Sequence, residues 1–443
     1  MVGKLFQLAD KHTSVRIEVV AGLTTFLTMA YIIFVNPLIL SSATGMDKEA
    51  LIAVTCIVTA AATIATGIFA NAPIAMAPGM GLNAFFAYLV ASEKMDWPTA
   101  LGVVFLSGVL FLALTVLGLR RRLVEAIPTS LISAIAVGIG LFITFIGLVK
   151  LGVVVGDPHT LVTAGPITAT VLIGLFGLLV MVFFEMRKIS GGLVVGILAA
   201  TILAVFFDDK TELPQHFVSV HLNIQAIAFR LDILGALKWS FFGTIFTLTF
   251  MDMFDSVGTL VACCHQAGMV DERGRIQGLD RLMGIDALAT VFGALLGTST
   301  TTSYIESAAG IEQGGRSGLT SIVTGGLFLL ALLFVPVVEI VPAYATAPAL
   351  IMVGLFMMKE VKKIDFTNLE EAFPAFIIMI MIALSYSIST GLAFGFISFT
   401  LIKVVSGKAK EIKPAMAVIV VFSMLFLTLD QLGGLIAYFK HLK

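Results

Sequence analysis

Long apolar stretches alternate with short polar connections along almost the whole chain. The first seven lie at about 17–40, 50–70, 72–91, 99–119, 129–149, 167–186 and 191–207. After a polar stretch from Asp208 to about Leu234, seven more lie at about 238–264, 283–297, 299–313, 318–341, 345–358, 372–387 and 389–405. Because a membrane-spanning helix needs roughly 20 apolar residues, the pattern predicts an all-α polytopic membrane protein with fourteen spans.

The two sets of stretches resemble each other in sequence. The segment ISGGLVVG at 189–196 reappears as ISTGLAFG at 388–395, each time at the seventh stretch of its set. An odd number of spans per repeat inverts the second copy relative to the first, as in many secondary transporters. We therefore predict a first inverted repeat at 1–207, an extracytoplasmic connection at 208–237, a second repeat at 238–405 and a C-terminal segment at 406–443. Whether the apolar run at 415–438 spans the membrane, re-enters it or lies on it stays open.

Composition and charge agree with a membrane location. Charged residues make up 12% of the 443 residues, whereas a soluble domain usually carries about 25%. Basic residues gather in alternate connections, as at Arg120, Arg187 and Lys359, and the positive-inside rule then places the amino terminus in the cytoplasm. We expect a multi-pass protein of the cell inner (cytoplasmic) membrane, surrounded by the lipid bilayer.

Several function classes lack support in the sequence. With 27 Lys+Arg residues against 28 Asp+Glu residues, the chain has no positive excess for binding nucleic acid. Its three cysteines and six histidines show no disulfide or metal-ligand spacing. A phosphate-binding glycine loop, a nucleophile with its base and a cleavable signal peptide are not found in the sequence. We expect no ATP-driven transport, no enzyme activity, no metal and no cofactor.

Two of the apolar stretches are poor continuous helices. The third begins with NAPIAMAPGMG at 71–81, where prolines and glycines disfavour a helix before about Met80. The tenth begins with TSTTTS at 298–303, ahead of a short helical stretch. Non-helical backbone at membrane depth is tolerated where it lines a cavity or is buried in protein, and half-helix amino termini point N–H groups at a ligand. We predict a binding site where the two segments meet; the alternative is a pair of kinked structural helices.

Three acidic residues lie inside apolar stretches, where a charge is costly and marks function by default. Asp252 and Asp255 are three positions apart, so they share one face of a helix. Glu306 lies at the start of the second half-helix. Such carboxylates can accept the N–H groups of a planar heterocycle and can carry a proton across the membrane. The alternative is a structural carboxylate that binds backbone N–H groups, and Asp252 is the least decided of the three.

Neutral side chains near the two broken stretches add to this hypothesis. Asn83 offers both a donor and an acceptor, although a buried asparagine can equally join two helices. Tyr304 and Phe85 are able to stack on a flat ligand, although aromatic residues in membrane helices more often serve packing. From these residues alone, the predicted solute is planar and polar.

The sequence resembles the nucleobase:cation symporter-2 (nucleobase–ascorbate transporter) superfamily, and within it the AzgA-like purine permease branch. The resemblance covers essentially the whole chain. It is carried by AGLTTFLTMAY at 21–31, APGMGLNAFF at 77–86, FDSVGTL at 254–260, YIES at 304–307 and ATAPAL at 345–350. Where relatives carry a histidine one turn after the acid of span 8, this chain has Thr259, so the role of that histidine is absent.

The resemblance implies a core domain of spans 1–4 and 8–11, a gate domain of spans 5–7 and 12–14, and a homodimer. It also implies that a nucleobase binds between spans 3 and 10. By motif position, Asp255 matches the acid of span 8, and Glu306 matches the acid of span 10, with Tyr304 and Ile305 beside it. In the purine branch, Asp252 and Asn83 match positions assigned to purine binding.

We therefore predict a proton-coupled importer of purine nucleobases. Asp252 and Glu306 would hold the purine, with Asn83, Tyr304, Ile305 and Phe85 as further substrate-binding residues. Asp255, together with Glu306, would couple transport to the proton. A Na⁺ ion is the less favoured coupling ion, and the sequence does not separate adenine from guanine and hypoxanthine. The alternative is an anion transporter of the related sulfate-permease architecture, for which acids beside the site are repulsive.

Overall fold

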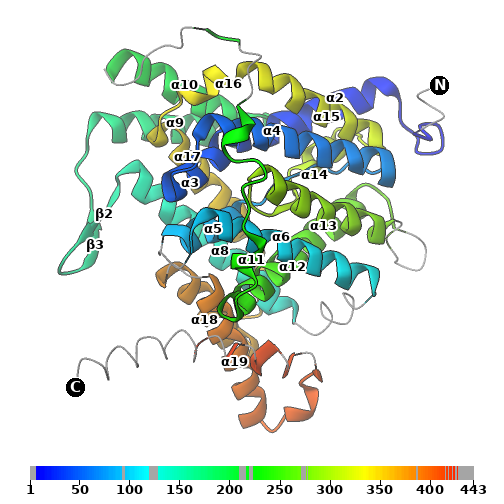
Figure 1. Ribbon diagram of the computed structural model, residues 1–443, viewed down its shortest axis with the longest axis vertical. Coiled ribbons are helices and arrows are strands. Elements are labelled where there is room, and N and C mark those ends of the chain that lie inside the picture. Colours follow the sequence, from blue (N-terminus) through cyan, green and yellow to red (C-terminus); the bar gives the residue numbers. More distant parts are fainter. Residues whose placement is uncertain are drawn as a thin grey trace.

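The structure is a computed structural model that describes residues 6–91, 95–118, 128–208, 216–218, 223–270, 276, 278–385 and 388–414, with scattered positions up to 427. These residues form an almost entirely helical bundle (Figure 1). The predicted run at 415–438 lies largely outside them, as do the arginines at 120–122. Eight helical stretches among the described residues are long and apolar enough to cross a membrane, so the chain is an integral membrane protein. Fourteen crossings and the inversion of the second half stay predictions.

The elements of the first half follow the predicted stretches closely. They are α2 (Val15–Met29), α3 (Ile32–Thr44), α4 (Lys48–Ala65), the π-helical turn η1 (Thr66–Ala70), β1 (Met76–Pro78), α5 (Met80–Ala91), α6 (Trp97–Val116), α8 (Thr129–Leu151), β2 (Val154–Asp157), β3 (Leu161–Ala164), α9 (Ala169–Met186) and α10 (Gly192–Phe207). The first predicted stretch is thus two helices that join at Ala30 and Tyr31. The hairpin β2–β3 projects from the side of the bundle (Figure 1).

The second half has shorter pieces between its helices. Its elements are η2 (Ile224–Ala226), α11 (Ile233–Ala236), η3 (Trp239–Phe241), α12 (Phe242–Gln266), α13 (Leu279–Leu296), β4 (Thr301–Ser303), α14 (Ser307–Glu312), α15 (Gly318–Ala331), η4 (Leu332–Phe334), α16 (Val335–Glu339), α17 (Ala343–Met357), η5 (Met358–Lys363), α18 (Leu369–Leu384), α19 (Ile388–Val405) and η6 (Ala409–Glu411). Each predicted apolar stretch therefore contains at least one helix.

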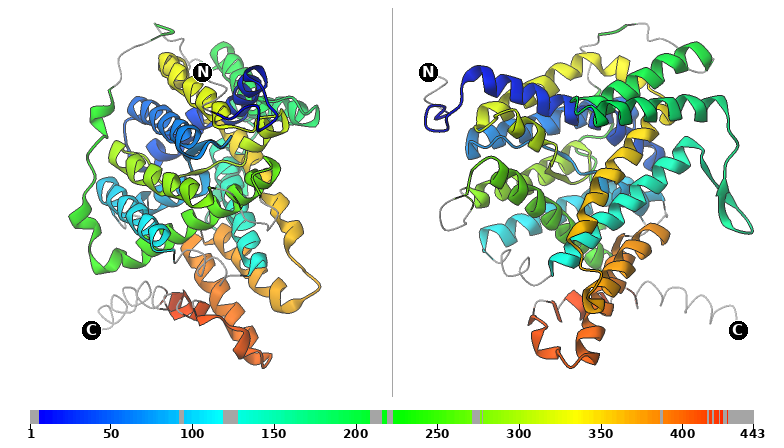
Figure 2. Two further views of the ribbon diagram at one scale, coloured as in Figure 1. Left: turned by 90° about the vertical axis from the view of Figure 1, so that its right-hand side faces the viewer. Right: turned by 180° about the vertical axis from the view of Figure 1, so that it is seen from behind.

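The helices pack in two groups that draw on both halves of the sequence (Figures 1 and 2). The first group consists of α2–α6 and α12–α16, with α15 lying against both α2 and α4 and with α13 against α6. The second group consists of α8, α9, α10, α17, α18 and α19, with α8 lying against both α17 and α18. The close approach of α8 to α17 needs glycine, because a Cβ at Gly354 would lie 2.5 Å from the carbonyl oxygen of Gly140.

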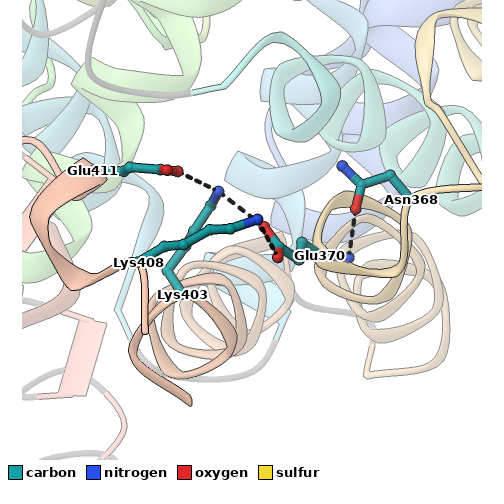
Figure 3. A network of polar contacts seen from close by, with 5 residues as sticks. All are labelled: Asn368, Glu370, Lys403, Lys408 and Glu411. Atoms are coloured by element: carbon teal, nitrogen blue, oxygen red, sulfur yellow. Dashed lines mark hydrogen bonds and ion pairs between the residues drawn. The ribbon is translucent and has the colours of Figure 1, made fainter. Parts of the chain in front are cut away.

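A polar network ties the end of α19 to the start of α18 (Figure 3). Glu370 accepts from Lys403 at 3.0 Å and from Lys408 at 2.6 Å, and Lys403 also donates to Glu411 at 2.8 Å. The side chain of Asn368 caps α18 by accepting from the backbone N–H of Glu370 at 3.1 Å. Partly exposed ion pairs of this kind contribute little stability each, so we read the network as a local tie between the two helix ends.

Candidate functional site

The two broken stretches pair with each other inside the first group of helices. Strands β1 and β4 are antiparallel, with Met76 opposite Ser303 and Ala77 opposite Thr302. Two more backbone bonds extend the pair, from Gly79 N to Thr300 O at 2.9 Å and from Tyr304 N to Ala75 O at 3.0 Å. The predicted extended backbone is confirmed in both stretches, as is the start of α5 at Met80.

Hydroxyl groups from neighbouring helices satisfy the outer edges of this buried strand pair. Thr63 of α4 exchanges hydrogen bonds with the backbone of Met76, both at 3.1 Å. On the other edge, Thr290 of α13 accepts from Thr301 N at 3.2 Å and donates to Thr301 O at 2.9 Å. Since buried backbone N–H and C=O groups need hydrogen-bond partners, these side chains supply the partners that further strands would give in a wider sheet.

The half-helices that follow the strands differ in length. Helix α5 has 12 residues, whereas α14 has 6. A helix dipole needs aligned peptide units, so α14 contributes less to the field at the site than the sequence pattern predicts. What the second broken stretch offers at this point is therefore mainly its side chains, among them Glu306, which immediately precedes α14.

Asp255 and Glu306 are the acids that remain accessible beside the strand pair. Asp255 of α12 is exposed, and Glu306 is half-buried. Both carboxylates are therefore at least partly accessible, unlike the fully buried acids nearby. Ile305, which precedes Glu306 in sequence, is an apolar side chain that is 48% exposed. An accessible pair of carboxylates next to an apolar side chain suits a ligand that is flat and carries N–H groups.

Asp252 lies one turn from Asp255 on α12 but is buried, with only 1% of its surface exposed. Its Oδ2 atom accepts from the hydroxyl of Thr290 at 3.0 Å. Its Oδ1 atom has no hydrogen-bond partner within the described residues. Since buried polar atoms are nearly always paired, this free oxygen atom is a position where a ligand or water can bind.

Asn83 of α5 resembles Asp252, because it is buried and only one of its two polar side-chain atoms has a partner within the described residues. It is fully buried, and its Oδ1 atom accepts from the hydroxyl of Ser299. Its Nδ2 atom lacks a partner in the part of the chain that the structure describes. Asn83 therefore joins the two broken stretches, as the structural alternative for this residue requires, and still leaves a free donor group near them.

Tyr304 and Phe85 pack into the interior of the protein. Tyr304 is 5% exposed, and its hydroxyl donates to the carbonyl oxygen of Pro78 at 2.5 Å, which fastens the two strands together. Phe85 is 2% exposed and belongs to the main hydrophobic core. In this conformation neither ring is open for stacking on a ligand, whereas the aliphatic side chain of Ile305 is exposed.

A comparison of the sequence with protein families matches residues 16–394 to the model described as a permease family. The chain belongs to this family. Within it, the chain is a member of the purine branch of the nucleobase–ascorbate transporter superfamily, as its motifs predicted. A guanine/hypoxanthine permease of Bacillus subtilis, PbuG, is 42% identical over 96% of this chain and 99% of its own length. An adenine permease of Escherichia coli, AdeP, is 38% identical over 96% of this chain and 95% of its own length. This permease is therefore a transporter and not an enzyme.

The fold of the permease has been seen in a more distant protein. The transmembrane domain of the cyanobacterial bicarbonate transporter BicA superposes with a TM-score of 0.64, covering 83% of this chain and 95% of that domain. The two sequences are 16% identical, so the likeness concerns the fold alone.

The sequence analysis did not single out two further buried acids of the permease. Asp286 of α13 is fully buried, and its Oδ1 atom accepts from the hydroxyl of Ser303 in β4 at 3.3 Å. Glu18 of α2 is also fully buried, and it accepts from the backbone N–H groups of Arg316, Ser317 and Thr320. Both lie inside predicted apolar stretches, so the criterion that selected Asp252 and Glu306 applies to them equally.

Proposed function

We propose that this permease imports purine nucleobases together with protons by alternating access. The observation that carries the proposal is the accessible carboxylate pair, Asp255 and Glu306, beside the paired strands of a chain in the permease family. The substrates named for PbuG and AdeP are guanine, hypoxanthine and adenine, and all three are flat rings with N–H donors. A carboxylate that accepts such groups forms charge-assisted hydrogen bonds, which are among the stronger kinds.

In this proposal Glu306 receives the N–H groups of the purine first, because it is the more open of the two proposed binding acids. Asp252 and Asn83 complete the binding through Oδ1 and Nδ2, which are among the buried atoms that lack partners within the described residues. Ile305 supplies an apolar contact for the ring, and Tyr304 and Phe85 support the site from behind. Asp255 carries the proton, and the supporting observation is that its side chain is exposed.

We further propose that the two packing groups are the moving parts. The first group would be the core of spans 1–4 and 8–11, and the second the gate of spans 5–7 and 12–14, within two inverted repeats at 1–207 and 238–405 and in a homodimer. A hydrogen bond between groups is that from Lys150 of α8 to Ser42 of α3, at 2.7 Å. Apolar contacts such as those of α3 with α17 and of α5 with α8 also join the groups, and apolar surfaces slide without breaking directional bonds.

An anion transporter is the second function that the fold allows, since a bicarbonate transporter shares it. Two accessible carboxylates at the site disfavour an anion, because like charges at short range repel strongly where water is scarce. A neutral nucleobase is not repelled in this way, because it carries no net charge.

Uptake of labelled hypoxanthine into cells without their own purine permeases tests the proposal. We expect saturable uptake that adenine or guanine inhibits, that uracil does not, and that a proton uncoupler abolishes. Uptake that persists with the uncoupler but stops when Na⁺ is removed would replace the proton by Na⁺. Uptake of bicarbonate or sulfate without any competition by purines would contradict the proposed substrate.

Replacement of Asp255 by asparagine tests the coupling role. Since an amide cannot give up a proton, we expect Asp255→Asn to lose uphill accumulation, so that hypoxanthine only equalises across the membrane, while exchange of internal for external hypoxanthine continues. Asp365→Asn changes an exposed carboxylate between η5 and α18 and should behave as wild type. Wild-type accumulation by Asp255→Asn would exclude it as the proton carrier.

A further inference from the structure

The junction between α2 and α3 brings a phenol group to the candidate site. Helix α2 ends at Met29, α3 begins at Ile32, and Tyr31 lies between them. Its side chain is 1% exposed, and its hydroxyl donates to Oε1 of Glu306 at 2.6 Å. Building on the proposed function, we propose that Tyr31 is a positioning residue that orients the Glu306 carboxylate for the purine.

The environment of Glu306 shows why its carboxylate needs an external partner. Glu306 stands at the position before α14, yet its side chain makes no capping bond to the first turn of that helix. Nor does it form an ion pair at or below 4.0 Å among the described residues. Besides the backbone N–H of Glu306 itself, the hydroxyl of Tyr31 holds the carboxylate from another part of the chain. A hydrogen bond to an ionised acceptor is short and strong.

This arrangement divides the two carboxylate oxygens between the protein and the ligand. Tyr31 occupies Oε1, and in the proposal Oε2, a carboxylate oxygen with room for more than one hydrogen bond, receives an N–H group of the purine. Because Tyr31 is buried at the junction of α2 and α3, its hydroxyl is held by packing and does not have to be ordered when the ligand arrives. A carboxylate already oriented in the free protein loses less conformational entropy on binding, which favours affinity.

The chain contains a matched pair of residues that serves as a control. Tyr344 of α17 donates to Oδ2 of Asp208 at 2.6 Å, the same chemistry at the same distance as the pair of Tyr31 and Glu306. It belongs to the second group of helices, whereas the candidate site lies in the first. Phenylalanine at either position keeps the ring and removes only the hydroxyl.

We would measure the KM and Vmax of hypoxanthine uptake in Tyr31→Phe and Tyr344→Phe, corrected for the amount of protein in the membrane. Loss of one hydrogen bond to a charged acceptor should raise the KM of Tyr31→Phe about tenfold, with Vmax nearly unchanged, whereas Tyr344→Phe keeps the wild-type KM. A purely structural tyrosine would lower the amount of protein or Vmax in both variants without a change of KM. An unchanged KM in Tyr31→Phe would overturn the inference.

A second measurement does not depend on transport. Dicyclohexylcarbodiimide modifies carboxyl groups in membranes, and mass spectrometry of the purified, full-length protein identifies the modified residue. We expect faster modification of Glu306 in Tyr31→Phe than in wild type or Tyr344→Phe, because Oε1 is no longer occupied. Equal rates would overturn the positioning role even if purines are transported. Faster modification without purine uptake by wild type would support the role of Tyr31 and overturn the proposed function.

Discussion

Replacement of Glu306 by glutamine is expected to weaken purine binding about 30- to 150-fold, equivalent to roughly 2–3 kcal/mol. Glutamine keeps the size and one acceptor oxygen but loses the negative charge, and a charge-assisted hydrogen bond is about twice as strong as a neutral one. It also presents an NH₂ group, which cannot accept an N–H group of the purine. Because Glu306 is half-buried and makes no ion pair at or below 4.0 Å among the described residues, the variant should still fold.

Binding of hypoxanthine to the purified protein, followed by calorimetry, measures this effect directly. Glu312→Gln is a matched control, since Glu312 stands at the other end of the same helix α14, is exposed, and accepts from Gln266 at 3.1 Å. We expect wild-type affinity for the control. Equal affinities for Glu306→Gln and Glu312→Gln would remove Glu306 from the site and would leave the ligand without its main acceptor.

The second large effect concerns stability and comes from Glu18. Its carboxylate accepts from three backbone N–H groups at the start of α15, at 3.0, 3.2 and 3.2 Å, and from the hydroxyl of Thr320 at 2.6 Å. A negative charge at a helix amino terminus also interacts favourably with the helix dipole. In Glu18→Ala these donors lose their partner in a buried place, and the free energy of unfolding should fall by on the order of 3–5 kcal/mol.

The thermal midpoint of the detergent-solubilised protein, followed by size-exclusion chromatography after heating, tests this prediction. Glu18→Gln keeps an acceptor oxygen and should lose only about 1–2 kcal/mol. Glu185→Ala removes an exposed acid at the end of α9 and should melt as wild type does. If Glu18→Ala had the same thermal midpoint as Glu185→Ala, the helix cap would be unimportant for the stability of the fold.

Glu18 belongs to a wider polar clamp that holds the ends of both broken stretches. Lys11 donates to the carbonyl oxygens of Asn71, just before β1, and of Arg316, just after α14, at 2.7 and 3.0 Å. The side chain of Asn71 in turn accepts from Gly318 N at 2.8 Å. Since Asn71 has a positive φ of 47°, a conformation that asparagine tolerates better than most residues, the chain turns here into the strand. Loss of the Glu18 cap should therefore also loosen the strand pair.

The sequence by itself determined the features that depend on neighbours along the chain. Apolar stretches of spanning length predicted the helices, and prolines and glycines ahead of Met80 predicted extended backbone followed by a helix, which the structure confirms. Motifs quoted from five stretches predicted the family, which the comparisons confirm. These results were possible because helix formation, chain breaking and the burial of apolar residues in lipid depend on local composition.

Only the tertiary structure decided which residues meet and which of them are accessible. Asp252 and Asp255 are equivalent in sequence pattern, yet one is buried against Thr290 and the other is exposed. Tyr31 donates to Glu306, and β1 pairs with β4, although in each case the two partners belong to opposite halves of the chain. Such contacts depend on how the helices pack against one another, and side-chain packing and hydrogen-bond pairing over long sequence distances leave no periodic signal in a single sequence.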